Sequence, residues 1–374
     1  VRLYPERAGA GTRGPREAAA DAAPVVPALD NPAAHYGPVT YGLFAVAIAA
    51  ARGQGIVAQL MAARIIAVLL GMGGALATAW AARESGLRWS LALSAGAVVG
   101  YQPILSQQTA AVTTDAGLVC FSALAFALGV RWLARPRAWS GIGLGLAIGL
   151  ALLSKPSAVF LVPLLLFLLW PVARRGQTAD QRRRALALAA ASGFLALVPF
   201  LVWNQLHPSV IAHTGPPGSL HEYARIVLGH RFAYLLGQVD SFWGNFGWFE
   251  QSLPQPVLAF CRALSLVMAL LALAGVGLAR GRARVAAVAG MLGFLGCAGI
   301  AFGFDLLLWR YQRGIGLQGR YFLPGFPLLV VAIMVGVQAL GRRGRVPGAV
   351  FLAVVMVGLN GLSLLTLWNR FYLA

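Results

Sequence analysis

One lysine stands apart in this chain and invites a chemical interpretation. Lys155, in LLSKPSA, is the only lysine among 30 basic residues, so a general bias toward arginine does not explain it. Its ammonium is a compact charge that suits a phosphate group. The alternative is an interfacial cation whose stem lies along apolar surface while its head reaches water. The residue alone leaves both roles open.

One acid lies at a boundary that is crowded with polar side chains. Asp115, in SQQTAAVTTDAGL, follows polar residues that a lipid-facing turn would not need. These residues are Ser106, Gln107, Gln108, Thr109, Thr113 and Thr114. A carboxylate in such a place can assist proton transfer or support a bound ion. The alternative is an acid at a helix start that favours the helix dipole, with Thr113 or Thr114 as the cap.

Three arginines frame the short segment RYQRGIGLQGRYFLP. They are Arg310, Arg313 and Arg320, and Gly319 beside Arg320 allows an anion to approach the backbone closely. Asp305 lies about one helical turn before Arg310, and its simplest role is to form an ion pair with one of these arginines. Cations that outnumber acids in this way suit an anionic ligand.

The composition indicates that membrane-spanning helices position these residues. Hydrophobic residues make up 59% of the chain and charged residues 11%, and the mean hydropathy is +0.74. These values exclude a soluble globular domain. Apolar runs near the length of a bilayer crossing predict an all-α, polytopic transmembrane helix bundle of about ten spans. The expected spans are 60–82, 90–108, 115–134, 139–154, 157–173, 185–203, 256–280, 284–309, 321–341 and 347–368.

Arginine clusters fall at every second boundary between the expected spans. The clusters are Arg83 and Arg88, then Arg131, Arg135 and Arg137, then Arg174, Arg175 and Arg182 to Arg184, then Arg280, Arg282 and Arg284, then Arg342, Arg343 and Arg345. Positive residues mark the cytoplasmic side of a membrane protein. The net charge of +19 therefore reflects topology in a bacterial inner membrane, not binding to nucleic acid. The other boundaries, with Asp115, Lys155, Asp240 and Arg320, then share the extracytoplasmic face.

Several segments are expected outside the spans. Residues 1–37 predict disorder or an outer-loop remnant, and residues 38–374 predict the transmembrane domain. The apolar stretch 36–51 and the amphipathic segment 219–237 predict helices that lie on the outer surface. The second of them belongs to a larger outer loop, 204–255, whose SFWGNFGW suits a membrane interface.

The motifs of water-soluble nucleotide chemistry are absent from the sequence, including the P-loop and the serine nucleophile elbow. Cations beside an aromatic-rich interface suit an amphiphilic substrate with a phosphate at headgroup depth, such as a polyprenyl-phosphate-linked sugar. The cations would bind the phosphate, and a carboxylate would deprotonate an acceptor hydroxyl. Two alternatives stay open: a transporter or flippase of lipid-linked sugars, and a non-catalytic membrane subunit. The sequence shows no internal repeat, which counts against the transporter.

Several segments, in this order, carry a resemblance to a known family. They are HYGPVTYGL at 35–43, ARIIAVLLG at 63–71, SQQTAAVTTDAGL at 106–118, GLALLSKPSAVFLVPLLL at 149–166, SFWGNFGW at 241–248 and QGRYFLPGFPLL at 318–329. Together they resemble bacterial relatives of the dolichyl-phosphate-mannose protein mannosyltransferases, within the GT-C glycosyltransferase superfamily. The resemblance covers residues 30–330 and points to a branch with Ser-Phe-Trp-Gly and Gly-Arg-Tyr-Leu-Phe-Pro type signatures. It does not include the family's first membrane helix, which we expect to be missing here.

The resemblance implies a GT-C fold and an extracytoplasmic site that uses a polyprenyl-phosphate sugar donor. The acceptor would be a glycan, a lipid or a protein. An acid in the first outer loop is essential in the family. Asp30 lies near the matching segment and is the expected base, while Asp115 matches the acid of the second outer loop. The residues assigned to phosphate or substrate are Lys155, Arg310, Arg320, His35, Tyr36, Asp240 and Trp243. No cofactor is implied with certainty, and a divalent cation stays open.

Overall fold

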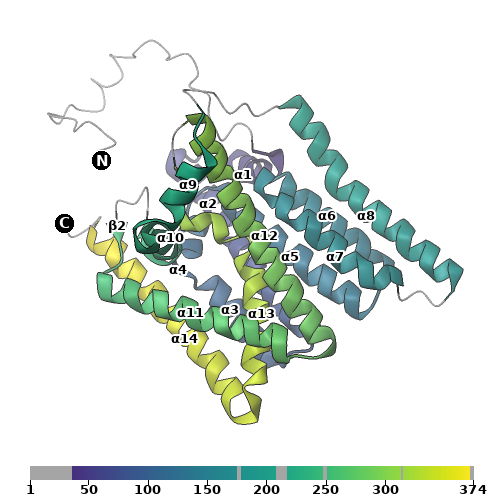
Figure 1. Cartoon of the computed structure of the whole chain (residues 1–374). Helices are drawn as coiled ribbons and strands as arrows, with labels where there is room; N and C mark the ends of the chain where they lie inside the picture. The colour runs from purple at the N-terminus through teal and green to yellow at the C-terminus, as the bar shows by residue number, and fades with distance from the viewer. Residues whose placement is uncertain (1–35, 175–177, 208–216, 247–250, 313–314, 371–374) are drawn as a thin grey trace. The chain divides into compact units, whose positions relative to one another are not determined.

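The protein is a bundle of α-helices, seen in a computed structural model. The structure describes residues 36–174, 178–207, 217–246, 251–312 and 315–370. The chain divides after His35, and everything below concerns the unit Tyr36–Ala374. Besides helices, its described part has one antiparallel ribbon, formed by β1 (Asn245–Phe246) and β2 (Gln251–Ser252) (Figure 1).

Six helices of the described part are long and apolar enough to cross a membrane. They are α2 (Ile56–Glu84), α5 (Thr114–Ala134), α8 (Ala179–Leu206), α11 (Gln255–Leu278), α12 (Gly281–Gln312) and α14 (Gly341–Trp368). Shorter apolar helices are α3 (Trp89–Gly100), α6 (Ala138–Leu152), α7 (Leu161–Arg174) and α13 (Phe326–Ala339). Every expected span coincides with one of these helices. The all-α, multi-pass membrane fold is therefore confirmed, while the number of crossings stays a prediction.

Two expected helices are broken where the sequence analysis predicted one continuous segment. The span 90–108 ends as α3 at Gly100 and resumes as α4 (Pro103–Ala110). Pro103 lacks an N–H to continue the first helix, and the Gln102 side chain accepts a hydrogen bond from the backbone of Leu105 and so caps the second. The helix break turns the polar end of this segment into a separate element.

The predicted surface helix 219–237 is also interrupted. It forms α9 (Leu220–Leu228), a short 3₁₀ turn η3 (His230–Phe232) and α10 (Ala233–Gly244). Arg231 and Phe232 have φ of 56° and 60°, the left-handed region, which a continuous right-handed helix excludes. The prediction of one helix was therefore wrong, and α10 instead continues through the SFWG motif.

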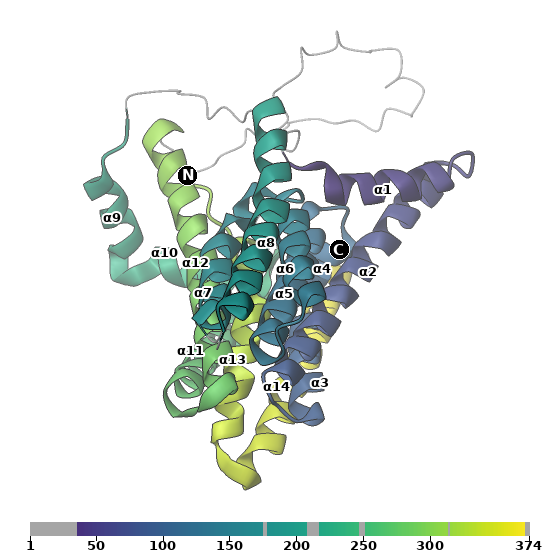
Figure 2. The ribbon, with the colours of Figure 1, turned by 90° about the vertical axis from the view of Figure 1, so that its right-hand side faces the viewer.

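The arginine-rich connections lie at one end of the unit. Arg131 at the end of α5 pairs with Glu84 at the end of α2, with 2.5 Å between Nη1 and Oε1. The guanidinium of Arg282, at the start of α12, lies against Gly86 in the α2–α3 turn. Figure 2 shows the α11–α12 and α13–α14 turns at this same end, away from α1 and α9. The charge pattern therefore corresponds to a real clustering of loops in space.

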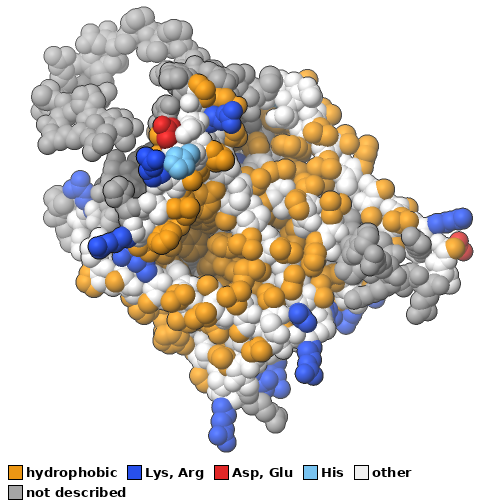
Figure 3. All heavy atoms as spheres, in the orientation of Figure 1, with side chains coloured by type: hydrophobic (Ala, Val, Ile, Leu, Met, Phe, Trp, Pro, Cys, Tyr) orange, Lys and Arg blue, Asp and Glu red, His pale blue; other side chains and the backbone are white. Residues whose placement is uncertain are grey.

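The core is built around α13, whose residues are almost all buried. Neighbouring helices approach it closely: a side chain at Gly336 would meet the backbone oxygen of Leu271 in α11. The outer helices instead expose leucine, valine and phenylalanine, and hydrophobic side chains cover most of the face seen in Figure 3. Lys and Arg side chains gather along the lower edge of that view. An apolar outer surface around a packed core is what a bilayer requires.

One helix crosses the direction of the others. α1 (Pro38–Ala50) lies across the direction of α2 and α5 in Figure 2 and exposes Leu43, Val46 and Ile48. Its orientation agrees with the predicted helix that lies along the membrane surface. Its N-terminal end reaches the turn that carries the unique lysine, which places it beside the candidate site.

Candidate functional site

The lysine and the acid that the sequence singled out form a buried ion pair. Lys155 lies in the turn between α6 and the 3₁₀ helix η2 (Pro156–Phe160), and Asp115 lies in the first turn of α5. The lysine Nζ is 2.6 Å from the aspartate Oδ1, and the two side chains are only 11% and 7% exposed. The lysine head therefore does not extend to open water, which argues against a snorkelling cation.

Two tyrosine rings flank the same ammonium. Its Nζ lies 5.2 Å from the ring centre of Tyr36 and 5.3 Å from that of Tyr321, within range of cation–π attraction. Burial lowers the pKa of Lys155, but the Asp115 carboxylate and the tyrosines raise it by more, and the net pKa is raised above its ordinary value. The side chain is therefore a permanent cation at neutral pH.

Close backbone packing at the start of α1 fixes the lysine turn. The amide of Val39 donates to the backbone oxygen of Leu153 at 3.1 Å, two residues before Lys155. A side chain at Gly37 would collide with that same oxygen, so only glycine allows this approach. Within the His-Tyr-Gly-Pro motif, Gly37 thus brings Tyr36 to the lysine through a backbone contact that permits no other residue at position 37.

The structure agrees only in part with the alternative role of Asp115, an acid that favours the dipole at the start of a helix. Thr113 is the N-cap residue of α5, but its side chain makes no capping bond. Its hydroxyl donates instead to the backbone oxygen of Gln108 at 3.2 Å. Asp115 does lie in the first helical turn, where the helix dipole favours an acid. Its direct partner is nevertheless the lysine.

A second aspartate, Asp305 in α12, organises the segment that leads to Arg320. It is 1% exposed and accepts hydrogen bonds from the hydroxyls of Tyr223, at 2.9 Å, and Tyr234, at 2.6 Å. It also accepts the backbone amides of Gly316 and Leu317 at 2.8 and 3.0 Å. The sequence analysis considered pairing with an arginine. The carboxylate instead joins α9, α10 and the 315–320 segment to α12.

The hydroxyl donors of this cluster remain protonated. Burial and then the hydrogen bonds to Asp305 raise the pKa of Tyr223 and Tyr234 above the ordinary value for tyrosine. Both phenols therefore donate to the carboxylate at neutral pH. This cluster could not be predicted from the sequence, because the tyrosines lie 82 and 71 residues away from Asp305 along the chain.

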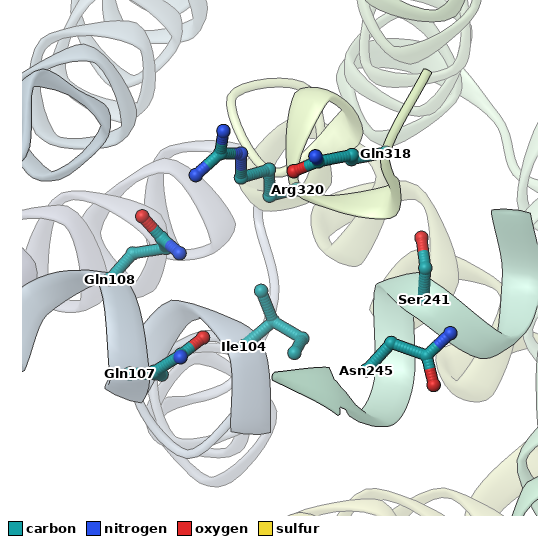
Figure 4. A pocket seen from close by; sticks show the side chains of 7 residues that line it. All are labelled: Ile104, Gln107, Gln108, Ser241, Asn245, Gln318 and Arg320. Atoms are coloured by element: carbon teal, nitrogen blue, oxygen red, sulfur yellow. The ribbon is translucent and has the colours of Figure 1, made fainter. Parts of the chain in front are cut away.

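Arg320 lies at the edge of a small polar pocket. The residues lining it are Ile104, Gln107, Gln108, Ser241, Asn245, Gln318 and Arg320 (Figure 4). They come from α4, from the end of α10 with β1, and from the short 3₁₀ helix η4 (Gly319–Phe322) with the residue before it. The Arg320 guanidinium lies 5.5 Å from the ring centre of Tyr321, the ring that also faces Lys155. One tyrosine therefore connects the pocket with the ion pair.

The remaining predicted residues lie elsewhere. Asp240 in α10 forms a bidentate pair with Arg262 in α11, at 2.7 and 2.5 Å. Trp243 is 1% exposed and its indole N–H donates to the hydroxyl of Ser265 at 2.7 Å. Both contacts fasten α10 to α11 and favour a structural role. Arg310 is exposed at the end of α12.

Two predicted residues, Asp30 and His35, lie outside the described residues. The expected catalytic base therefore stays a prediction from the sequence. Within the described part, no three His, Cys, Asp or Glu side chains lie close enough together to hold a metal ion. A divalent cation stays an open prediction.

The helical fold and the apolar outer surface define the class of protein, which is a multi-pass, helical membrane protein. Residues 16–331 match the family described as Predicted membrane protein (DUF2142), and the chain belongs to that family. No curated protein matches the sequence. Among solved structures, the oligosaccharyltransferase of Archaeoglobus fulgidus, crystallised with zinc and sulfate, is similar at 14% identity and a TM-score of 0.44. The similarity covers 88% of this chain and 44% of that one, so this chain spans less than half of that enzyme.

Proposed function

We propose that the protein is a membrane glycosyltransferase that moves a sugar from a polyprenyl-phosphate donor to an acceptor on the extracytoplasmic side. The observation that carries this proposal is the pair of cations, Lys155 and Arg320, which lie 5.3 and 5.5 Å from the centre of the Tyr321 ring. They lie beside a polar pocket in a protein whose outer surface is apolar. Such a site suits an anionic phosphate attached to a membrane-embedded tail.

The two cations would act on the phosphate of the donor. The acceptor hydroxyl attacks C1 of the sugar and loses its proton to a base, for which Asp30 is the candidate. The bond between C1 and the phosphate oxygen breaks, and polyprenyl phosphate leaves with the additional negative charge. Arg320 and Lys155 would stabilise that charge as it develops.

Asp115 has a supporting part in this scheme. It accepts one N–H of the Lys155 ammonium, which leaves further N–H donors for a phosphate oxygen. The carboxylate also keeps the buried ammonium charged and fixes its direction. Since it is paired in this way, Asp115 is poorly placed to act as the free base.

Transfer assays with the purified full-length protein test this proposal. A labelled polyprenyl-phosphate sugar is incubated with candidate glycan, lipid and protein acceptors. We expect Arg320→Ala and Lys155→Ala to reduce transfer about 100-fold, because each removes a charge that acts on the leaving group. Arg135→Ala is the matched control, since this arginine is exposed at the arginine-rich end.

The result that would overturn the proposal is equally clear. Undiminished transfer in both variants would remove the phosphate role of the cations. Movement of the labelled lipid across vesicle membranes without any sugar transfer would instead establish a transporter. Melting temperatures of each variant show that a loss of transfer does not come from unfolding.

A further inference from the structure

We propose that the pocket between α4, α10 and η4 binds one hydroxyl group of the transferred sugar, and that Gln107, Gln108 and Gln318 select which sugar is accepted. The inference rests on the proposed function and adds the residues that set donor specificity. It assigns to these glutamines a role that the sequence analysis did not give them. The lining, an unpaired buried carbonyl and the rigidity of the walls support it.

The lining has the chemistry of a site for a neutral polyol. Three glutamines, Asn245 and Ser241 offer both hydrogen-bond donors and acceptors, as sugar hydroxyls do. The lining contains no carboxylate and one purely apolar residue, Ile104. Its single charge is Arg320, at the edge toward Tyr321 and Lys155. A phosphate held between the two cations would therefore place its attached sugar against the amides.

A buried carbonyl in the pocket lacks a partner. Gln108 is 7% exposed, and its side-chain oxygen has no hydrogen-bond partner among the described residues. Buried polar atoms are nearly always paired, so this oxygen points to a donor that the described residues do not supply. In Figure 4 the Gln318 side chain points toward Arg320, and the Gln108 amide turns its nitrogen toward the pocket. A ligand hydroxyl in the pocket could accept a hydrogen bond from either amide.

The pocket walls are fixed before any ligand arrives. The Gln102 side chain donates to the backbone oxygen of Phe242 at 2.5 Å and so joins α4 to α10. The amide of Gly319 donates to the Ser241 hydroxyl, and a side chain at Gly319 would collide with the Phe242 backbone. The empty space is about 250 Å³, part of it open to solvent. The enclosed cavity itself has a volume of only about 10 Å³, which is room for about one water-sized group such as a single sugar hydroxyl.

Donor selection by single-residue variants tests the inference. Initial rates are measured with polyprenyl-phosphate hexoses that differ at one hydroxyl, either inverted or replaced by hydrogen. For wild-type protein, loss of a recognised hydroxyl should reduce kcat/KM about 100-fold or more, because it leaves a buried polar group unpaired. In Gln108→Met and Gln318→Met, which keep the side-chain length, the preferred donor should lose its rate while the deoxy donor changes less than about threefold. Gln54→Met, in the exposed α1–α2 turn, is the control.

The outcomes separate this inference from the proposed function. If wild-type protein transfers sugar and both variants keep its full donor preference, the pocket assignment is wrong and the transferase activity stands. If no donor is transferred, the proposed function fails, and binding of hexose 1-phosphate is measured by thermal shift. Binding that is weakened by Gln108→Met would still support the sugar site, and no binding would overturn it. Should Gln108→Met fail to fold, Gln107→Met takes its place.

Discussion

At the scale of single residues, the central feature of the candidate site is the buried ion pair of Lys155 and Asp115. Lys155 and Asp115 were each singled out by the sequence, and their location at boundaries of the same side follows from the arginine pattern. Their direct contact does not follow, because it depends on how α5 and α6 pack. Breaking one partner of a buried pair leaves an uncompensated charge. The pair should therefore respond as one system to mutation and to pH.

Asp115→Asn should shift the alkaline limit of the protein to lower pH. The raised pKa of Lys155 means that its pairing stabilises the fold fully below the ordinary lysine pKa of about 10.4, and this is lost as pH rises through the folded value. Without the carboxylate, the largest influence that raises the pKa is lost, and burial, which lowers the pKa, is opposed only by the tyrosines. We also expect about 3 kcal/mol less unfolding free energy at neutral pH. Thermal unfolding in detergent between pH 6 and 11 measures both effects.

A matched control exists at the opposite end of the unit. Glu84→Gln removes the partner of Arg131, also a partly buried pair, and should leave the alkaline limit unchanged. An unchanged alkaline limit in Asp115→Asn as well would show that the carboxylate does not control the charge of the lysine.

At the scale of elements, one carboxylate holds together segments that are distant in sequence. Asp305→Asn should loosen the 315–320 segment, because the amide keeps only one acceptor oxygen and its NH₂ group cannot accept, so two of the four hydrogen bonds are lost. We expect about 2 kcal/mol lower unfolding free energy and, in transfer assays, a larger increase in KM for the donor than decrease in kcat. Calorimetry and steady-state kinetics measure the two effects.

The control for this change is an aspartate of different surroundings. Asp180→Asn alters an exposed acid in the first turn of α8 and should change stability by less than about 1 kcal/mol. Equal effects of the two substitutions would mean that the buried cluster does not organise the segment that carries Arg320.

The positions of the helices could largely be predicted, while the breaks within them could not. Apolar runs of bilayer length reveal a span, and Gly229 marks the end of α9, but the kink that follows depends on left-handed conformations at Arg231 and Phe232, which are not glycines. The pocket has the same limitation. Gln107 and Gln108 were noted as polar neighbours of Asp115, but only tertiary packing brings Gln318 opposite them. Asp305 was seen, yet its tyrosine partners were not.

At the scale of the whole molecule, the orientation in the membrane decides which side the site faces. The arginine-rich connections share one end, and positive loops are retained in the cytoplasm. In a background without Cys120, Cys261 and Cys297, we expect a membrane-impermeant maleimide added to intact cells to label Leu220→Cys in α9. Arg183→Cys, at the start of α8, should be labelled only after the membrane is opened. Mass-shift gels read both.

The reverse labelling pattern would overturn the proposed side of the reaction. Both positions are exposed in the described structure, so access to reagent does not depend on unfolding. Labelling of Arg183→Cys from outside, with Leu220→Cys protected, would place the pocket on the cytoplasmic side.

The burial of α13 has a consequence for the response to bilayer thickness. This helix has 14 residues, which is roughly 21 Å and too short for a hydrocarbon core of about 30 Å. Other helices surround it, so its length does not have to match the thickness of the bilayer. Hydrophobic mismatch must instead fall on long outer helices such as α2 and α14, which can tilt to relieve it. A thinner or thicker membrane would then change the tilt of the outer helices, while the packing around α13 stays the same.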